Sequence, residues 1–185
     1  MMGALGTALF AASFYLAPIA PSIAFDFSLI GVFVAGFYGG PKLGFITGLI
    51  AGILPGIMFG PLGTGGVFGL IGLPFGKALT GMTSGLVSKG VKLTGNSRTP
   101  LLAVPASFIA YIPEAFFTWG YFIFLLGGYA LGTTVFVTVL SKALIEVGIM
   151  SLIMTALLAN QGFNCYLKAN LLQKQSNSKA SLKSL

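Results

Sequence analysis

Long apolar stretches cover almost the whole chain from its first residues to Ala159, and only short turns rich in Gly and Pro interrupt them. Hydrophobic residues make up 56% of the 185 residues and charged ones 7%, whereas roughly 25% of an ordinary soluble domain is charged. A surface that faces water cannot be built from so few charges. The sequence therefore predicts a polytopic, all-α membrane protein.

Six transmembrane helices are predicted, because six helices of ~20 residues each use about 120 residues and leave short loops and one tail. Five of the predicted helices cover residues 3–16, 27–39, 67–87, 100–125 and 133–158. The remaining one, third in chain order, follows a turn at 40–42 and ends near residue 59. We expect residues 1–160 to form one transmembrane substrate-binding domain. Residues 161–185 are expected to be a polar, basic and partly disordered tail.

The placement of basic residues predicts the orientation of the bundle. Six crossings put both termini on one side. If that side is the cytoplasm, then Lys42, the loop at 89–99 and the tail all lie inside, and the outer loops carry only Asp26. This is the distribution that the positive-inside rule requires. We therefore predict cytoplasmic N- and C-termini and read the net charge of +7 as a membrane feature, with no nucleic-acid partner.

Several kinds of chemistry are disfavoured by what the chain contains. It has no His, and its one cysteine, Cys165, cannot form an internal disulfide. We expect no metal site, no cofactor and no redox function. A Gly-rich phosphate loop of the GxxxxGKS type is also missing from the sequence, so the chain is not expected to hydrolyse ATP.

Small residues recur at four-residue spacing in two of the predicted helices. Lipid tails compete with apolar side chains, so membrane helices associate where small residues let their backbones approach. A six-member ladder predicts a groove in which a neighbouring helix lies: Gly40, Gly44, Gly48, Gly52, Gly56 and Gly60. Ala4, Ala8 and Ala12 form a second ladder, which serves either internal packing or the docking of another membrane protein.

Four charged residues fall within predicted helices: Lys77, Glu114, Lys142 and Glu146. A charge near the bilayer centre costs roughly 2.5–3.5 kcal/mol on insertion scales, so it normally faces protein or water. One interpretation is that Lys142 pairs with Glu146 or Glu114 and only fixes helix register. The other is that these groups bind a polar ligand.

Other candidate ligand groups surround Glu114. Pro113 frees the carbonyl of Ile109, and nearby aromatic rings suit either stacking on a flat ligand or an interfacial belt. Asp26 is read either as a cap of the second helix or as part of the site. The candidate substrate-binding residues are Asp26, Lys77, Tyr111, Glu114, Trp119, Tyr121, Lys142 and Glu146.

These features together resemble the substrate-binding S component of an energy-coupling factor (ECF) transporter, over about residues 3–160. The resemblance rests on six helices in a short chain, the Ala4, Ala8 and Ala12 ladder, the loop at 17–26, and the stretch FDFSLIGVFVAGFYGGPKLGFITGLIAGIL with its Gly-Pro turn. The sequence departs from that family in that its first helix begins almost at Met1, and it carries no ligand-specific motif that we can identify.

The resemblance implies a non-enzymatic subunit in the plasma membrane of a bacterium or archaeon. Such a subunit captures a water-soluble vitamin or related metabolite from outside, and a transmembrane coupling subunit with two ATP-binding subunits drives import. The alanine ladder would dock on the coupling subunit. In this interpretation Lys77 or Lys142 pairs with an anionic group of the ligand, Glu114 accepts a hydrogen bond from its amine or amide, and Trp119 stacks on it.

Three alternatives are weighed against this interpretation. A stand-alone secondary transporter would use Glu114 or Glu146 to carry a proton, although no inverted repeat is visible in the sequence. An intramembrane enzyme would have to use Ser141 beside Lys142, or Ser107 near Glu114. A purely structural membrane subunit is the third alternative.

Overall fold

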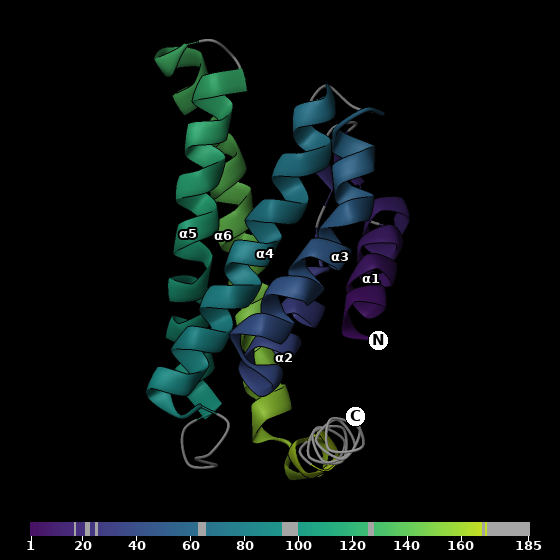
Figure 1. Cartoon of the computed structure of the whole chain (residues 1–185), viewed down its shortest axis with the longest axis vertical. Helices are drawn as coiled ribbons and strands as arrows, with labels where there is room; N and C mark the ends of the chain where they lie inside the picture. Colours follow the sequence, from purple (N-terminus) through teal and green to yellow (C-terminus); the bar gives the residue numbers. More distant parts are fainter. Residues whose placement is uncertain are drawn as a thin grey trace, which may run out of the picture.

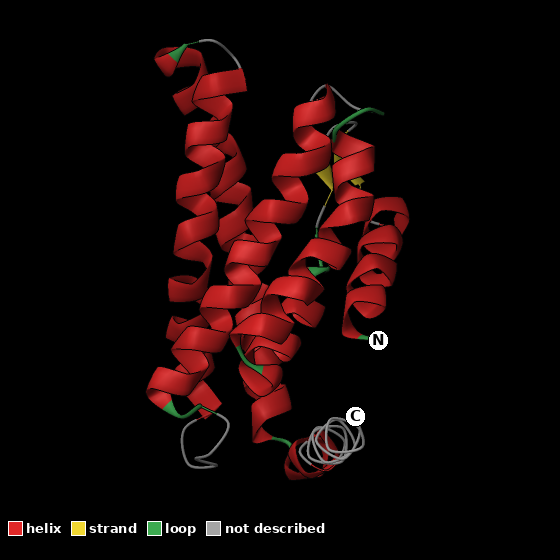
Figure 2. Cartoon of the chain, in the orientation of Figure 1, coloured by secondary structure: helices red, strands yellow, loops and turns green. Residues whose placement is uncertain are grey.

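The computed structural model of the chain describes residues 1–16, 18–20, 23–24, 26–62, 66–93, 100–125, 128–167 and 169. Helices dominate these residues, which confirms the all-α class, and a small hairpin is the exception (Figure 2). The longer helices are α1 (Met2–Leu16), α2 (Leu29–Gly39), α3 (Pro41–Phe59), α4 (Gly66–Val91), α5 (Ala103–Leu125) and α6 (Tyr129–Ala159). The hairpin pairs β1 (Pro18–Ala20) with β2 (Ile23–Ala24), and a 3₁₀ turn, η1 (Pro100–Leu102), precedes α5.

Three helical stretches are long and apolar enough to cross a membrane: Pro41–Phe59, Pro100–Phe124 and Tyr129–Ala159. Large apolar side chains on these helices point away from the bundle. Such a surface suits lipid, because soluble monomers rarely expose large continuous apolar patches. The outward-facing residues include Ile46, Ile53, Ile109, Phe116, Ile145 and Leu152. These observations agree with a membrane protein, while six crossings remain a prediction.

The predicted glycine groove on α3 is confirmed, and α4 is the helix that fills it. The two helices run side by side in Figure 1 and make the most extensive contact in the bundle. A Cβ on Gly52 would lie 2.9 Å from the backbone nitrogen of Pro74, and one on Gly60 would lie 2.6 Å from that of Leu70. Side chains larger than hydrogen would therefore push the two backbones apart.

Helix α2 is short and lies at the centre of the bundle. It contacts α1, α3, α4 and α6, and every residue from Gly31 to Phe37 is buried. A helix that is apolar on all sides belongs in a core. At ~1.5 Å per residue α2 is about 16 Å long, which is too short to cross a bilayer core of ~30 Å. Its first residue, Leu29, is buried, so α2 begins inside the bundle. The hairpin that precedes α2 in the sequence lies in the upper half of the molecule in Figure 2.

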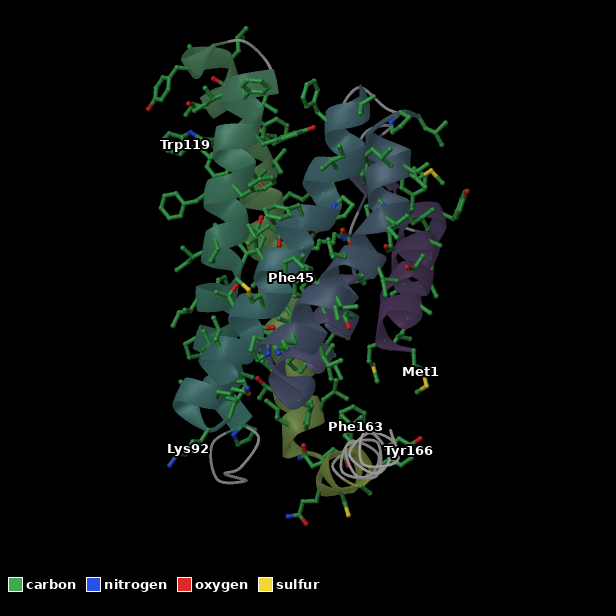
Figure 3. All side chains as sticks on the ribbon, viewed as in Figure 1. Met1, Phe45, Lys92, Trp119, Phe163 and Tyr166 are labelled. Atoms are coloured by element: carbon green, nitrogen blue, oxygen red, sulfur yellow. The ribbon has the colours of Figure 1, made fainter. Side chains whose placement is uncertain are left out.

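The two ends of the bundle differ in charge. At the end where α2 turns into α3, a Cβ on Gly40 would lie 3.1 Å from the Lys89 side chain, so the α2–α3 turn and the end of α4 meet there. Lys92 lies at the same lower end in Figure 3. Helices α1, α3 and α5 end on the opposite side (Figure 1), and the sequence segments that follow them, 17–25, 60–65 and 126–128, contain no Lys or Arg. The described structure thus agrees with the charge asymmetry expected from the sequence.

The segment expected to begin the polar tail is structured at its start. Residues 161–167 are helical, Leu167 is buried, and the Phe163 ring packs edge-to-face on Tyr38 of α2. The Tyr38 hydroxyl also donates a hydrogen bond to Asn164. The folded region therefore continues a few residues past the expected boundary at 160, and the rest of the expected tail, 170–185, lies outside the described residues.

Candidate functional site

Lys77 and Asp26 form a buried ion pair at the N-terminal end of α2. Lys77 lies near the middle of α4 with 3% of its surface exposed, and its ammonium donates hydrogen bonds to the Asp26 carboxylate and the Ser28 hydroxyl. The Ser28 N–H donates to Asp26 Oδ1 over 2.9 Å. Asp26 therefore accepts a hydrogen bond in the turn before α2, whose N-cap residue is Ser28, and it also neutralises Lys77.

Glu146 joins this pair from α6. Its Oε1 accepts the backbone N–H of Asp26 over 2.7 Å and lies 3.2 Å from Lys142 Nζ, one helical turn earlier. Lys142 and Glu146 thus form an ion pair within α6, which is one of the two pairings considered for Lys142 from the sequence. Because the same carboxylate also holds the backbone at Asp26, it ties the α1–α2 connection to α6.

Glu114 reaches the cluster from the middle of α5 and is buried. The Thr80 hydroxyl donates a hydrogen bond to its Oε2. A Cβ on Gly76 of α4 would lie 3.3 Å from Glu114 Cγ, so the glycine leaves room for the carboxylate. Among the described residues, no Lys or Arg nitrogen comes within ion-pair distance of Glu114. Asp26, Lys77 and Glu146 are nevertheless near enough to interact with it electrostatically.

The cluster has more negative than positive groups. Asp26, Glu114 and Glu146 are all three acidic residues of the chain, and all three lie here. Lys77 and Lys142 are the two cations, and each is paired with one carboxylate. If all five groups are ionised, the cluster carries one excess negative charge, which belongs to Glu114.

Tyr111 belongs to the cluster and Tyr121 lies beside it. Tyr111 is buried one turn from Glu114 and interacts electrostatically with all three carboxylates. The Tyr121 ring stacks on Phe117 and fits over Gly72 of α4, where a Cβ would lie 2.9 Å from the ring. Its hydroxyl is buried and has no hydrogen-bond partner among the described residues.

Trp119 is not brought to the cluster. Its indole N–H donates to Thr133 Oγ1 over 3.4 Å, and its ring contacts Tyr129 and Phe136, all on α6. Figure 3 shows it near the upper end of α5, away from the middle of the bundle. Five residues along a helix turn the side chain by about 140°, so Trp119 and Glu114 cannot share a face. Its position suits the interfacial-belt interpretation.

A proline inside α4, Pro74, packs against α3 and does not belong to the charged cluster. Pro74 lies against α3, where it is the neighbour that Cβ atoms on Gly52 and Gly56 would meet. The carbonyl of Leu70, which Pro74 leaves without its helical partner, faces the same groove, 3.0 Å from where a Gly56 Cβ would be. It is therefore not available to a ligand among the buried charges.

Three further residues belong to the cluster and were not predicted from the sequence. Ser28 and Thr80 supply hydroxyls, and the Phe10 ring of α1 lies 5.7 Å from Lys77 Nζ in a cation–π contact. Thr80 could have been found, since it follows Lys77 by three residues and shares its helical face. No sequence signal connects Phe10 with Lys77.

The alanine ladder of α1 faces outward. Ala4, Ala8 and Ala12 are exposed, while the opposite face packs into the bundle: a Cβ on Gly6 would lie 2.9 Å from Ala51, and Phe10 is fully buried. Packing within the described chain therefore does not use the ladder.

Among the described residues no group of His, Cys, Asp and Glu has the arrangement of a metal site. No protein-family model, curated protein or solved structure matches the chain.

Proposed function

We propose that this chain is a membrane-embedded solute-capture subunit of the ECF S-component type, in the plasma membrane of a bacterium or archaeon. It takes a small water-soluble vitamin or related metabolite from outside. A transmembrane coupling subunit and two ATP-binding subunits then power its release inward. The chain itself has no enzymatic role in this proposal.

The observation that carries the proposal is the buried polar cluster where α2, α4, α5 and α6 meet. Ionisable groups at this depth are costly and normally mark a substrate or ion pathway. A purely structural subunit would gain little from them, because buried ion pairs are often replaceable by apolar residues at no loss of stability. Because the short α2 begins inside the bundle, Asp26 in the connection before it lies within the cluster, where it contacts Lys77 and Glu146.

The exposed ladder of α1 supports the second half of the proposal. Three alanines on one face allow another helix to approach closely, as membrane helix pairs require. The inner face of the same helix carries Phe10, which touches Lys77 of the cluster. A coupling subunit that docks on Ala4, Ala8 and Ala12 would thus contact a helix whose opposite face carries a ring beside Lys77.

Retention of a small molecule by the purified protein is the direct test. The chain is purified gently, with and without co-expressed ECF coupling and ATP-binding subunits, and bound metabolites are identified by mass spectrometry. We expect one metabolite to be retained by the wild-type chain and lost in Glu114→Gln. The matched control is Ile109→Ala on the lipid-facing side of α5, which should retain it. Absence of any retained metabolite, or equal retention in Glu114→Gln, would refute the capture site.

One observation favours a second candidate, a proton-coupled secondary transporter. Glu114 is buried against the Thr80 hydroxyl and has no cationic partner among the described residues, which suits a carboxylate that gains and loses a proton. Uptake of the retained metabolite into proteoliposomes that contain this chain alone, driven by a pH gradient, would establish it. Uptake that needs added ATPase subunits and ATP would exclude it.

A further inference from the structure

The distribution of charge in the cluster bears on what kind of ligand it accepts. Lys77 is engaged by Asp26 and Ser28 and is 3% exposed, and Lys142 is engaged by Glu146. An anionic ligand would have to break one of these pairs and leave a carboxylate of the protein uncompensated. Both lysines that the sequence offers for an anionic ligand thus already have a carboxylate partner within the chain.

Glu114 is the group with an unmet requirement. An ionised carboxylate away from water needs a counter-charge or several hydrogen bonds, and Glu114 has one hydroxyl donor, Thr80. A cation beside Glu114 would bring the cluster from one excess negative charge to neutrality without disturbing either existing ion pair. No other ligand charge does this.

An aromatic column continues from Glu114 along the seam between α4 and α5. Residues 114, 117 and 121 lie on one face of α5, because steps of three and four follow the helical repeat. The Phe117 ring also contacts Phe75 of α4 at 5.2 Å between centroids, and Tyr121 stacks on Phe117. At ~1.5 Å per residue, the backbone of Tyr121 lies about 10 Å further along α5 than that of Glu114. The Tyr121 hydroxyl is buried and has no hydrogen-bond partner among the described residues.

We propose that the solute is an organic cation whose protonated amine or amidine binds Glu114 and whose flat, apolar body lies along Phe117 and Tyr121 between α4 and α5. Aromatic faces and a carboxylate are the groups that recognise organic ammonium ions. The Tyr121 hydroxyl supplies a hydrogen bond to a polar group at the far end of the solute. This inference rests on the proposed capture function and specifies the chemical class of its ligand.

Three probes that share the indole ring and differ in the charge of the group at the end of a short side chain test the inference: tryptamine, which is cationic, tryptophol, which is neutral, and indole-3-acetate, which is anionic. Binding to the purified full-length chain in detergent is measured by titration calorimetry. We expect tryptamine to bind at least about tenfold more tightly than tryptophol, and indole-3-acetate to bind most weakly. Equal affinity for tryptamine and tryptophol, or no binding of tryptamine, would overturn the proposal.

Two variants assign the preference to Glu114. Glu114→Gln keeps the shape and removes the charge, so the tryptamine preference should disappear. Lys142→Met removes the cation that neutralises Glu146, so tryptamine should bind as tightly as before or more tightly, whereas an anion site would lose affinity. A preference that survives in Glu114→Gln contradicts the assignment. If Glu114→Gln does not fold, the three probes on the wild-type and Lys142→Met chains still decide.

The outcomes separate this inference from the proposed function. Glu114-dependent retention of a neutral or anionic metabolite would leave the capture function intact and remove the cation inference. Conversely, tryptamine selectivity together with uptake that needs no ATPase would leave the ligand class intact and remove the ECF-type function.

Discussion

Gly48 of α3 and Ala78 of α4 face each other so closely that a methyl group on Gly48 would lie 2.6 Å from the Cα of Ala78. Real Cβ atoms do not approach backbone this closely, so the helices would have to separate. Backbone shifts forced by extra methyl groups in a packed core typically cost about 1–3 kcal/mol. The close contact between α3 and α4 thus depends on the absence of a side chain at Gly48.

We expect Gly48→Ala to lower the free energy of unfolding by about 1–3 kcal/mol, measured by thermal or denaturant unfolding in detergent. Gly120→Ala in α5 is the matched control, since a Cβ there meets nothing within 4 Å. Alanine is the better helix former by roughly 0.5–1 kcal/mol, so the control should be neutral or slightly stabilising. Similar unfolding midpoints for the two variants would contradict the glycine groove.

The buried pair of Lys77 and Asp26 predicts an asymmetric mutant cycle. Lys77→Met leaves the Asp26 carboxylate without its cation and should destabilise the fold by roughly 3–5 kcal/mol. Asp26→Asn in the same chain removes the stranded charge and should restore part of the lost stability. Unfolding midpoints of the two single variants and the double variant give the coupling. A double variant as unstable as the sum of the single ones would show that the two side chains act independently.

The helices could largely be predicted from the sequence because their signals are local. The apolar run and the Gly60–Pro61 break correctly place the end of α3 at Phe59, and the four-residue glycine spacing predicts a groove without knowledge of its occupant. Helix α4 continues a turn past the predicted end at 87 because Ser88 and Lys89 are polar but still helical. Hydropathy marks the lipid-contacting length of a helix, and a helix can extend beyond it.

The composition of the site was less predictable because it depends on contacts between helices. Counting residues along the predicted helices places Lys77, Glu114 and Lys142 at similar depth and Glu146 one turn deeper than Lys142. In the structure Lys77, Glu114 and Glu146 lie near one another. The partner of Lys77 depends on where the short α2 begins, which no local pattern reveals, so its pairing with Asp26 was not foreseen. The sequence places Trp119 one to two turns outward of Glu114 on the same helix, but the helical rotation between them puts Trp119 against α6.

The exposed ladder of α1 predicts a substitution that affects assembly and not folding. Ala8→Trp places a large side chain on a face that makes no contact within the described chain, so the unfolding midpoint should stay near the wild-type value. Close helix approach at that face would be blocked. We expect the ECF coupling subunit to be lost from the purified complex.

Ile109→Trp is the control for this experiment, because it adds the same bulk to a lipid-facing position that is 51% exposed on α5. That variant should still co-purify with the coupling subunit. Co-purification of Ala8→Trp at the wild-type level would rule out docking through the alanine ladder.

The single cysteine offers a test of orientation without disturbing the fold. Cys165 is exposed and stands in the sequence between Phe163 and Tyr166, which Figure 3 shows at the same lower end of the bundle as Lys92. Basic residues are retained on the cytoplasmic side during insertion, so a membrane-impermeant maleimide should label Cys165 in inside-out vesicles and not in intact cells.

Leu62→Cys in a Cys165→Ser background is the reciprocal control. Leu62 is 71% exposed just after α3, at the end whose connections carry no Lys or Arg, and should be labelled only from outside. Labelling of Cys165 in intact cells would show that the bundle has the opposite orientation in the membrane. The hairpin end would then face the cytoplasm, and capture of a solute from outside through that end would be ruled out.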